Sequence, residues 1–175
     1  RSGADSGTVT TLFPTLIVGG EGPYPASHLG RTLAKADQLL PVLRPFTVQG
    51  TFQLIHAADL ARMVVHLLDR GPAGEDLIAG NAPLTGGEAL AQLCAIFGLR
   101  PPRRRLDLTW LGPLVAFVAG HRMSSWDRWC LNQRHFAYPG AVNPRSLGLE
   151  PGLETLAEMA AHDGCWRPAS RVPGG

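Results

Sequence analysis

The sequence contains few cysteines, and none of them stands in a pattern that binds a metal or builds a disulfide framework. Cys94, Cys130 and Cys165 are odd in number, far apart and outside any C-x-x-C pair. Zinc ribbons and small secreted domains place their cysteines at short, regular spacings. The N-terminus also lacks the basic segment and apolar run of a signal peptide. We therefore expect reduced thiols, no metal site and a cytoplasmic location.

Lysine and long apolar runs are scarce as well. Lys35 is the only lysine among sixteen basic residues, the arginines are scattered, and the net charge is +2. A nucleic-acid surface gathers its basic residues on one face, so we expect no nucleic-acid partner. The most apolar stretch, residues 106–120, includes Asp107 and Pro113 and is shorter than the roughly 20 residues that a spanning helix needs. It predicts a buried helix and no membrane span.

One stretch, from Thr51 to Asp69, organises the remainder of the chain. The sequence has 175 residues, 45% of them hydrophobic, which is typical of a globular domain. Residues 52–56 alternate loosely as a short strand does, with His56 packed at its end, and Asp59 stands before apolar residues at helical spacing. We expect Asp59 to cap that helix through its carboxylate. The expected buried stripe comprises Leu60, Met63, Val64, Leu67 and Leu68.

Strand and helix patterns alternate elsewhere, which predicts an α/β fold. Residues 8–18 are rich in β-branched and apolar side chains, and Pro14 interrupts them. Because proline cannot donate to a ladder, the strand should end or bulge there. We expect this strand to pair in parallel and to keep an exposed apolar edge. The polar and glycine-rich ends, residues 1–7 and 165–175, should be flexible.

The middle of the chain predicts a second strand and helix. Residues 76–79 read as a short strand. Thr85 and Glu88 have the S/T-x-x-E spacing of a capping box, which opens a helix. Cys94 lies on the apolar face of that helix, so we interpret it as a core residue and not a reactive thiol.

Three strings resemble the second half of the NAD-dependent epimerase/dehydratase family, the extended and atypical short-chain dehydrogenases. They are residues 52–61 (FQLIHAADLA), residues 76–81 (DLIAGN) and the helix opening at residues 84–89 (LTGGEA). The resemblance implies that residues 1–175 form the C-terminal part of a Rossmann-like, doubly wound α/β fold, with a small mixed α/β substrate-binding subdomain. It implies NAD or NADP as the cofactor of the complete protein.

The family pattern also implies binding residues. A strand-end proline lies beside the nicotinamide ring in the family, which assigns Pro14 and Thr15 to the cofactor. The substrate then falls to Leu16, Gly19, His28 and Phe52. Leu16 replaces a residue that is commonly polar, and Phe52 stands where nucleotide-sugar epimerases carry a diphosphate-binding arginine. Phenylalanine cannot clamp a phosphate, so the substrate should be a small molecule other than a nucleotide sugar.

The family's catalytic parts are missing from this sequence. No glycine-rich turn lies between a strand and a helix, and neither Tyr24 nor Tyr138 has a lysine four residues later. We therefore assign no catalytic residue and expect this chain alone to bind no dinucleotide tightly. Two explanations stay open. The chain is the substrate-binding part of an NAD(P)-dependent oxidoreductase or epimerase, inactive without a Rossmann half in the same or another chain. Alternatively, it is a non-catalytic binding or interaction module derived from that family.

Overall fold

The computed structural model describes residues 9–19, 40–41, 45–47, 49–100, 106–107 and 135–163. The expected flexible ends, the glycine-rich loop after Gly19, His28 with its predicted helix, and nearly all of the apolar stretch after Leu106 lie outside these ranges. The elements are β1 (Thr11–Pro14), β2 (Leu16–Val18), β3 (Phe46–Thr47), β4 (Thr51–Phe52), β5 (Leu54–His56), α3 (Ala57–Arg70), β6 (Asp76–Ala79), β7 (Leu84–Thr85), α4 (Gly86–Ile96), β8 (Leu106–Asp107), β9 (His135–Phe136), the 3₁₀ turn η2 (Arg145–Leu147) and α7 (Leu156–Asp163).

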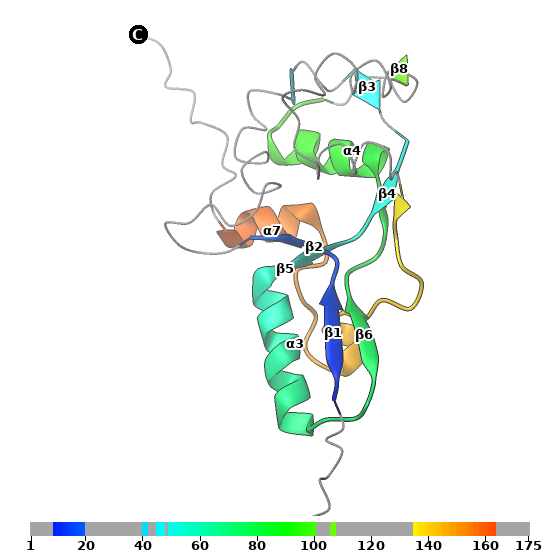
Figure 1. The fold of residues 1–175 in the computed structure, drawn as a ribbon. Coiled ribbons are helices and arrows are strands. Elements are labelled where there is room, and N and C mark those ends of the chain that lie inside the picture. Colours follow the sequence, from blue (N-terminus) through cyan, green and yellow to red (C-terminus); the bar gives the residue numbers. More distant parts are fainter. Residues whose placement is uncertain are drawn as a thin grey trace, which may run out of the picture.

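Short parallel pairs form the centre of the fold (Figure 1). Strand β1 pairs in parallel with β6, and β2 pairs in parallel with β5. Helix α3 connects β5, the partner of β2, to β6, the partner of β1. A third sheet joins β4 to β7 in antiparallel and to β9 in parallel. The α/β class with parallel strands, predicted from the alternation of patterns, is confirmed.

The chain changes partner at Thr15. Pro14 ends β1, and Leu16 begins β2. The amide of Thr15 still donates to Ala79 O at 2.9 Å, whereas the amide of Leu16 donates to Gln53 O at 3.2 Å. The expected strand is therefore two strands, and the prediction that it ends or bulges near Pro14 is confirmed. The side chains of Phe13 and Ile17 on these strands are solvent-exposed, and whether the strand edge itself is exposed stays a prediction.

The N-cap of α3 is His56 and not Asp59, which corrects the sequence prediction. The helix begins at Ala57, and Nδ1 of His56 accepts a hydrogen bond from the amide of Ala58 at 3.2 Å. Asp59 lies inside the first turn and is only 2% exposed. An imidazole nitrogen can accept an amide hydrogen bond as a carboxylate does. The cap therefore lies three residues before Asp59, the residue that was predicted because aspartate is a common capping residue.

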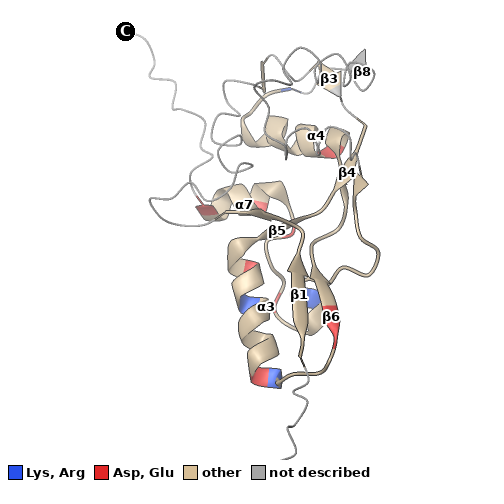
Figure 2. Cartoon of the chain, viewed as in Figure 1, with Lys and Arg blue, Asp and Glu red and all other residues tan. Residues whose placement is uncertain are grey.

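The apolar residues of α3 lie on two sides of the helix. Met63 is fully buried, but Val64 is 41% exposed and Leu68 is 75% exposed, so the buried stripe expected at these two positions is wrong. Ala61, Val64, Val65 and Leu68 follow the spacing i, i+3, i+4 and i+7 and are all exposed. Figure 2 shows an uncharged stretch in the second half of α3, between a basic residue near the middle of the helix and the charged residues at its end. We call these four residues the α3 stripe.

The core lies between α4, α7 and the strands. Thr85 and Glu88 form the predicted capping box at the start of α4. Cys94, on the same helix, is a fully buried free thiol, so its interpretation as a core residue is confirmed. The largest buried cluster contains Val18, Leu54, Ala89, Leu156, Met159 and Ala160.

Candidate functional site

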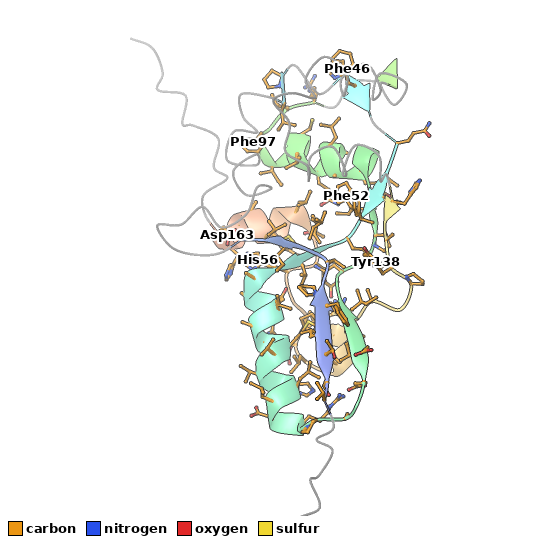
Figure 3. The ribbon with its side chains drawn as sticks, in the orientation of Figure 1. Phe46, Phe52, His56, Phe97, Tyr138 and Asp163 are labelled. Atoms are coloured by element: carbon orange, nitrogen blue, oxygen red, sulfur yellow. The ribbon has the colours of Figure 1, made fainter. Side chains whose placement is uncertain are left out.

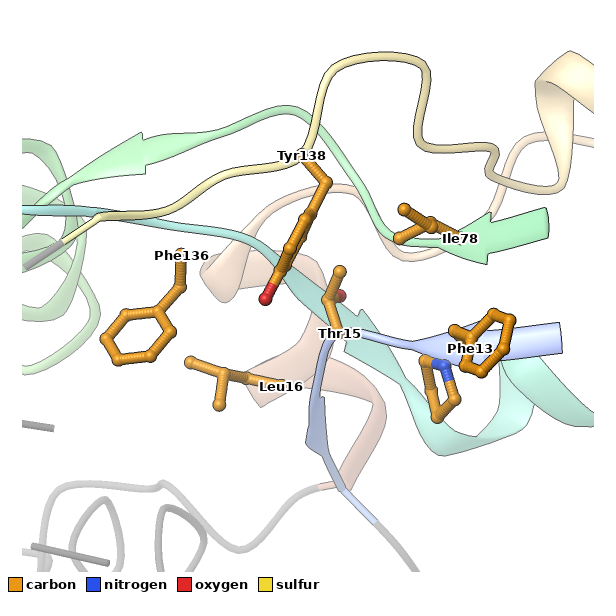
Figure 4. A pocket seen from close by; sticks show the side chains of 7 residues that line it. Phe13, Thr15, Leu16, Ile78, Phe136 and Tyr138 are labelled. Atoms are coloured by element: carbon orange, nitrogen blue, oxygen red, sulfur yellow. The ribbon is translucent and has the colours of Figure 1, made fainter. Parts of the chain in front are cut away.

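A pocket of about 370 Å³ opens where β1 ends and the chain turns into β2. Figure 4 shows its lining side chains, which come from the β1–β2 kink, from β6 and from the segment around β9. In open α/β sheets, ligands bind beyond the carboxyl ends of the strands, and Pro14 is the carboxyl end of β1. The volume falls in the usual range for small-molecule sites. The lining residues are Phe13, Pro14, Thr15, Leu16, Ile78, Phe136 and Tyr138.

Thr15 closes the bottom of this pocket. Its side chain packs against Gly80, where a Cβ atom would lie 2.8 Å from both Oγ1 and Cγ2 of Thr15. A larger residue at position 80 would therefore push the kink out of place. The Thr15 Oγ1 atom is buried and has no hydrogen-bond partner among the described residues. Buried hydroxyls are normally paired, so this hydroxyl is an exception among the described residues.

Gln53 holds the opposite wall. Its side chain is buried between β4 and β5, where Oε1 accepts the amide of Tyr138 at 2.7 Å. Its Nε2 donates to Asn81 O at 3.1 Å and lies 3.4 Å from Tyr138 O. One side-chain amide thereby satisfies both backbone groups of Tyr138, as a strand rung would. This contact fixes the main chain of the pocket wall.

One side of the pocket consists of residues that the sequence predicted to bind ligands, and the other side does not. Pro14, Thr15 and Leu16, predicted to contact cofactor and substrate, lie together in its lining. Phe136 and Tyr138 were not proposed. They reach the site because β9 pairs with β4 across more than eighty positions of sequence, and a two-residue strand has no periodicity by which to recognise it. The buried Gln53 beside them was the one usable signal, because a polar residue between strand residues needs a partner.

Two other predicted substrate residues, Phe52 and Gly19, do not line the pocket. Phe52 packs against the main core cluster. Gly19 has a φ of +84°, and a Cβ there would lie 2.0 Å from Nε2 of His56, so its described contact is with that imidazole. His28 lies outside the described residues.

His56, His162 and Asp163 form a second cluster, between β5, α3 and the end of α7 (Figure 3). Their ligand atoms lie within 4.8 Å of one another, but hydrogen bonding removes His56 from a metal site. Since Nδ1 of His56 accepts the Ala58 amide, the proton must lie on Nε2, which donates to Asp163 Oδ1 at 2.9 Å. A protonated nitrogen has no lone pair for a cation. The cluster therefore joins the C-terminus of α7 to the start of α3.

Each of the three described α-helices has an acidic residue in its first turn. Asp59 lies in the first turn of α3, Glu88 in that of α4 and Glu158 in that of α7. Hydrogen bonds from Thr85, chiefly from its backbone amide, lower the pKa of Glu88, and those from Thr155 lower the pKa of Glu158 in the same way. Glu88 and Glu158 therefore stay ionised at neutral pH. A carboxylate at a helix start repels phosphate, so neither α4 nor α7 offers a pyrophosphate site, and the start of α3 is capped by His56.

Comparison with known proteins defines the class of the fold. No protein-family model and no curated protein matches the sequence. Among solved structures, the chain shares its Rossmann-like α/β fold with proteins described as epimerases. The fold that the family resemblance implied is confirmed.

Three crystal structures illustrate this likeness. Human epimerase family protein SDR39U1 (isoform 2) with NADPH gives a TM-score of 0.60 at 18% identity, covering 95% of this chain and 50% of that one. PA4631, a nucleoside-diphosphate-sugar epimerase from Pseudomonas aeruginosa, gives 0.58 at 17% identity, covering 91% and 47%. The protein gox2253 gives 0.55 at 22% identity, covering 90% and 48%. The chain therefore spans about half the length of these structures.

Proposed function

We propose that this chain is the substrate-binding part of an NAD(P)-dependent oxidoreductase or epimerase of the short-chain dehydrogenase type, inactive without a cofactor-binding Rossmann half. The observation that carries the proposal is the position of the pocket. It lies at the carboxyl end of β1 and contains Pro14, Thr15 and Leu16, the residues that the family resemblance assigns to the nicotinamide and the substrate. We further propose a cytoplasmic location, which the free, buried Cys94 fits.

The described residues fit one end of a dinucleotide and not the other. Pro14 and Thr15 line the pocket, where they offer an apolar surface to a nicotinamide ring. When bound, that ring would supply hydride transfer. The pyrophosphate needs free amides at a helix start, but among the three described α-helices the start of α3 is capped by His56 and the starts of α4 and α7 carry Glu88 and Glu158. The missing half would therefore supply the pyrophosphate site.

Two exposed features support the presence of such a half. Within the described residues, β1 pairs on one side only, with β6. The α3 stripe borders a shallow groove of about 220 Å³. A helix with apolar residues on two sides is normally covered on both, and each further parallel strand brings a crossover helix that packs on a face of the sheet. The groove residues are Thr10, Leu12, Val64, Leu67, Leu68, Gly71 and Pro72.

The substrate proposed is a small molecule other than a nucleotide sugar. Phe52 packs into the core, at the position where such enzymes hold a diphosphate with arginine. None of the described residues that line the pocket is charged, so a diphosphate would find no counter-charge among them. Within the described residues, no helix is long and apolar enough to cross a membrane.

A charge placed in the α3 stripe tests the proposal. Leu68→Glu should leave the melting temperature of the 175-residue chain nearly unchanged, because Leu68 is already exposed there. In the longer protein that continues upstream of Arg1 to the start of its reading frame, the same change should lower it, because a charge would be buried. Ala157→Glu, at an exposed position in the first turn of α7, is the matched control and should leave both proteins unchanged.

The alternative is a non-catalytic binding or interaction module derived from the same family. The α3 stripe favours it equally, since an apolar helix face can bind a separate partner. The reading frame upstream of Arg1 separates the two proposals. A glycine-rich turn and a Tyr-x-x-x-Lys pair are expected there for the enzyme, whereas a start codon close to Arg1 would favour the module.

A further inference from the structure

The pocket combines an aromatic lining with very few polar groups, and this chemistry narrows the class of its ligand. The inference rests on the proposed function, because it concerns the same pocket. Phe13, Phe136 and Tyr138 present rings, and Leu16 and Ile78 present aliphatic groups. A sugar or another polyhydroxylated ligand would lose its water here without gaining hydrogen bonds in return. Flat apolar molecules, in contrast, stack against rings and lose only unfavourable hydration.

One polar group reaches the open part of the pocket. Figure 4 shows the hydroxyl of Tyr138 directed toward the space between Phe136, Leu16 and Thr15. No hydrogen bond of this hydroxyl is recorded within the described part of the chain, and Tyr138 is 43% exposed. The other hydroxyl, on Thr15, is buried against Gly80. A ligand therefore meets a mostly apolar surface with a single hydrogen-bonding group at its rim.

The position of that hydroxyl depends on Gln53. The Gln53 side chain is 3% exposed and binds the backbone of Tyr138, not its ring. Shortening or removing this amide would free the main chain of Tyr138 without altering the phenol itself. Gln53 does not line the pocket, so any effect that it has on a ligand must pass through the wall that it holds.

We propose that the pocket binds a flat, mainly apolar ligand with one carbonyl or hydroxyl group, and that this group forms a hydrogen bond with the Tyr138 hydroxyl. Gln53 is a positioning residue, which acts on the ligand by fixing Tyr138. Specificity thus comes from ring stacking for the body of the ligand and from one directed hydrogen bond for its polar end.

Matched probes test the proposal on the 175-residue chain without cofactor. Calorimetric titration compares 2-naphthol, naphthalene and UDP-glucose. We expect 2-naphthol to bind about fivefold more tightly than naphthalene, the effect of one hydrogen bond, and UDP-glucose to bind most weakly. Tyr138→Phe should remove the fivefold advantage and leave naphthalene unchanged. Leu68→Glu, in the α3 groove, is the control for binding outside the pocket and should alter neither affinity.

A double-mutant cycle tests the positioning role. Gln53→Met should lower 2-naphthol affinity as Tyr138→Phe does, and it should cause no further loss in the Tyr138→Phe background. An additive loss would overturn the role of Gln53. If Gln53→Met fails to fold, Tyr138→Phe, which keeps all the backbone bonds of Tyr138, still decides the ligand class.

Three results would overturn the ligand class: UDP-glucose binding as tightly as 2-naphthol, neither aromatic probe binding, or Tyr138→Phe leaving the preference for 2-naphthol intact. Because no dinucleotide is present in this titration, such a result would leave the proposed cofactor half standing. Conversely, an upstream reading frame without dehydrogenase motifs would refute the enzyme and leave the pocket chemistry standing.

Discussion

Replacing Asp59 with asparagine distinguishes two roles for its carboxylate: a buried anchor that holds Leu153, and a cap at the start of α3. The carboxylate accepts the amide of Leu153 at 2.6 Å through Oδ2 and Nη1 of Arg62 at 3.1 Å through Oδ1. Gly152 lies directly against it, since a Cβ there would be 2.4 Å from Oδ2. Asparagine keeps one acceptor and turns the other into a donor, which would face either an amide or a guanidinium. A hydrogen bond to a charged group contributes about 1.5–3 kcal/mol.

We therefore expect Asp59→Asn to lower the free energy of unfolding by about 1–2 kcal/mol, since Arg62 is partly exposed and its ion pair contributes little. Asp59→Ala should lower it by about 2–3 kcal/mol, because the Leu153 amide then stays buried without a partner. Urea unfolding of the 175-residue chain measures both. A helix cap behaves differently, because asparagine caps about as well as aspartate. An asparagine variant within about 0.3 kcal/mol of the wild type would refute the anchor and restore the cap.

Other parts of the structure give further predictions. His56→Ala should lower the free energy of unfolding by about 1–2 kcal/mol through loss of the α3 cap, and His56→Asn should recover part of it; equal losses would contradict the cap. Gly19→Ala should reduce the thermal midpoint more than Gly71→Ala, because both glycines have positive φ but only Gly19 faces a side chain. Equal midpoints would show that the His56 side chain moves aside at no cost in stability. The lowered pKa of Glu88 adds stability that is present above the ordinary glutamate pKa and is lost as pH falls through the folded value. Chemical unfolding from pH 7 to pH 3 should therefore show less pH dependence for Glu88→Gln than for the wild type, and identical pH profiles would refute this.

Local patterns predicted the local structure well. Thr85 and Glu88 identified a helix start because a capping box is built from residues three positions apart. Pro14 identified the break between β1 and β2 because a missing amide has the same effect in any sheet. The burial of Cys94 was predicted from helical spacing alone. In each case the relevant interactions join neighbours in sequence.

Long-range contacts account for what the sequence could not predict. The cap of α3 was placed at Asp59 because aspartate is a common cap, but the carboxylate turns instead toward Leu153, more than ninety residues away. The aromatic wall of the pocket depends on pairing between β4 and β9. Periodicity cannot show which of the two apolar sides of α3 is buried, because the residues on both sides have helical spacing. Which side is buried depends on the elements that surround the helix.

Dinucleotide binding tests the central claim most directly. NADH and NADPH are titrated calorimetrically into the 175-residue chain and into the longer protein that continues upstream of Arg1 to the start of its reading frame. The chain alone should bind neither cofactor more tightly than about 10 μM, roughly −7 kcal/mol, and the longer protein should bind one of them more tightly than that. Binding by the chain alone below about 10 μM, or no binding by the longer protein, would contradict the assignment of this chain as a substrate-binding part that needs a cofactor half.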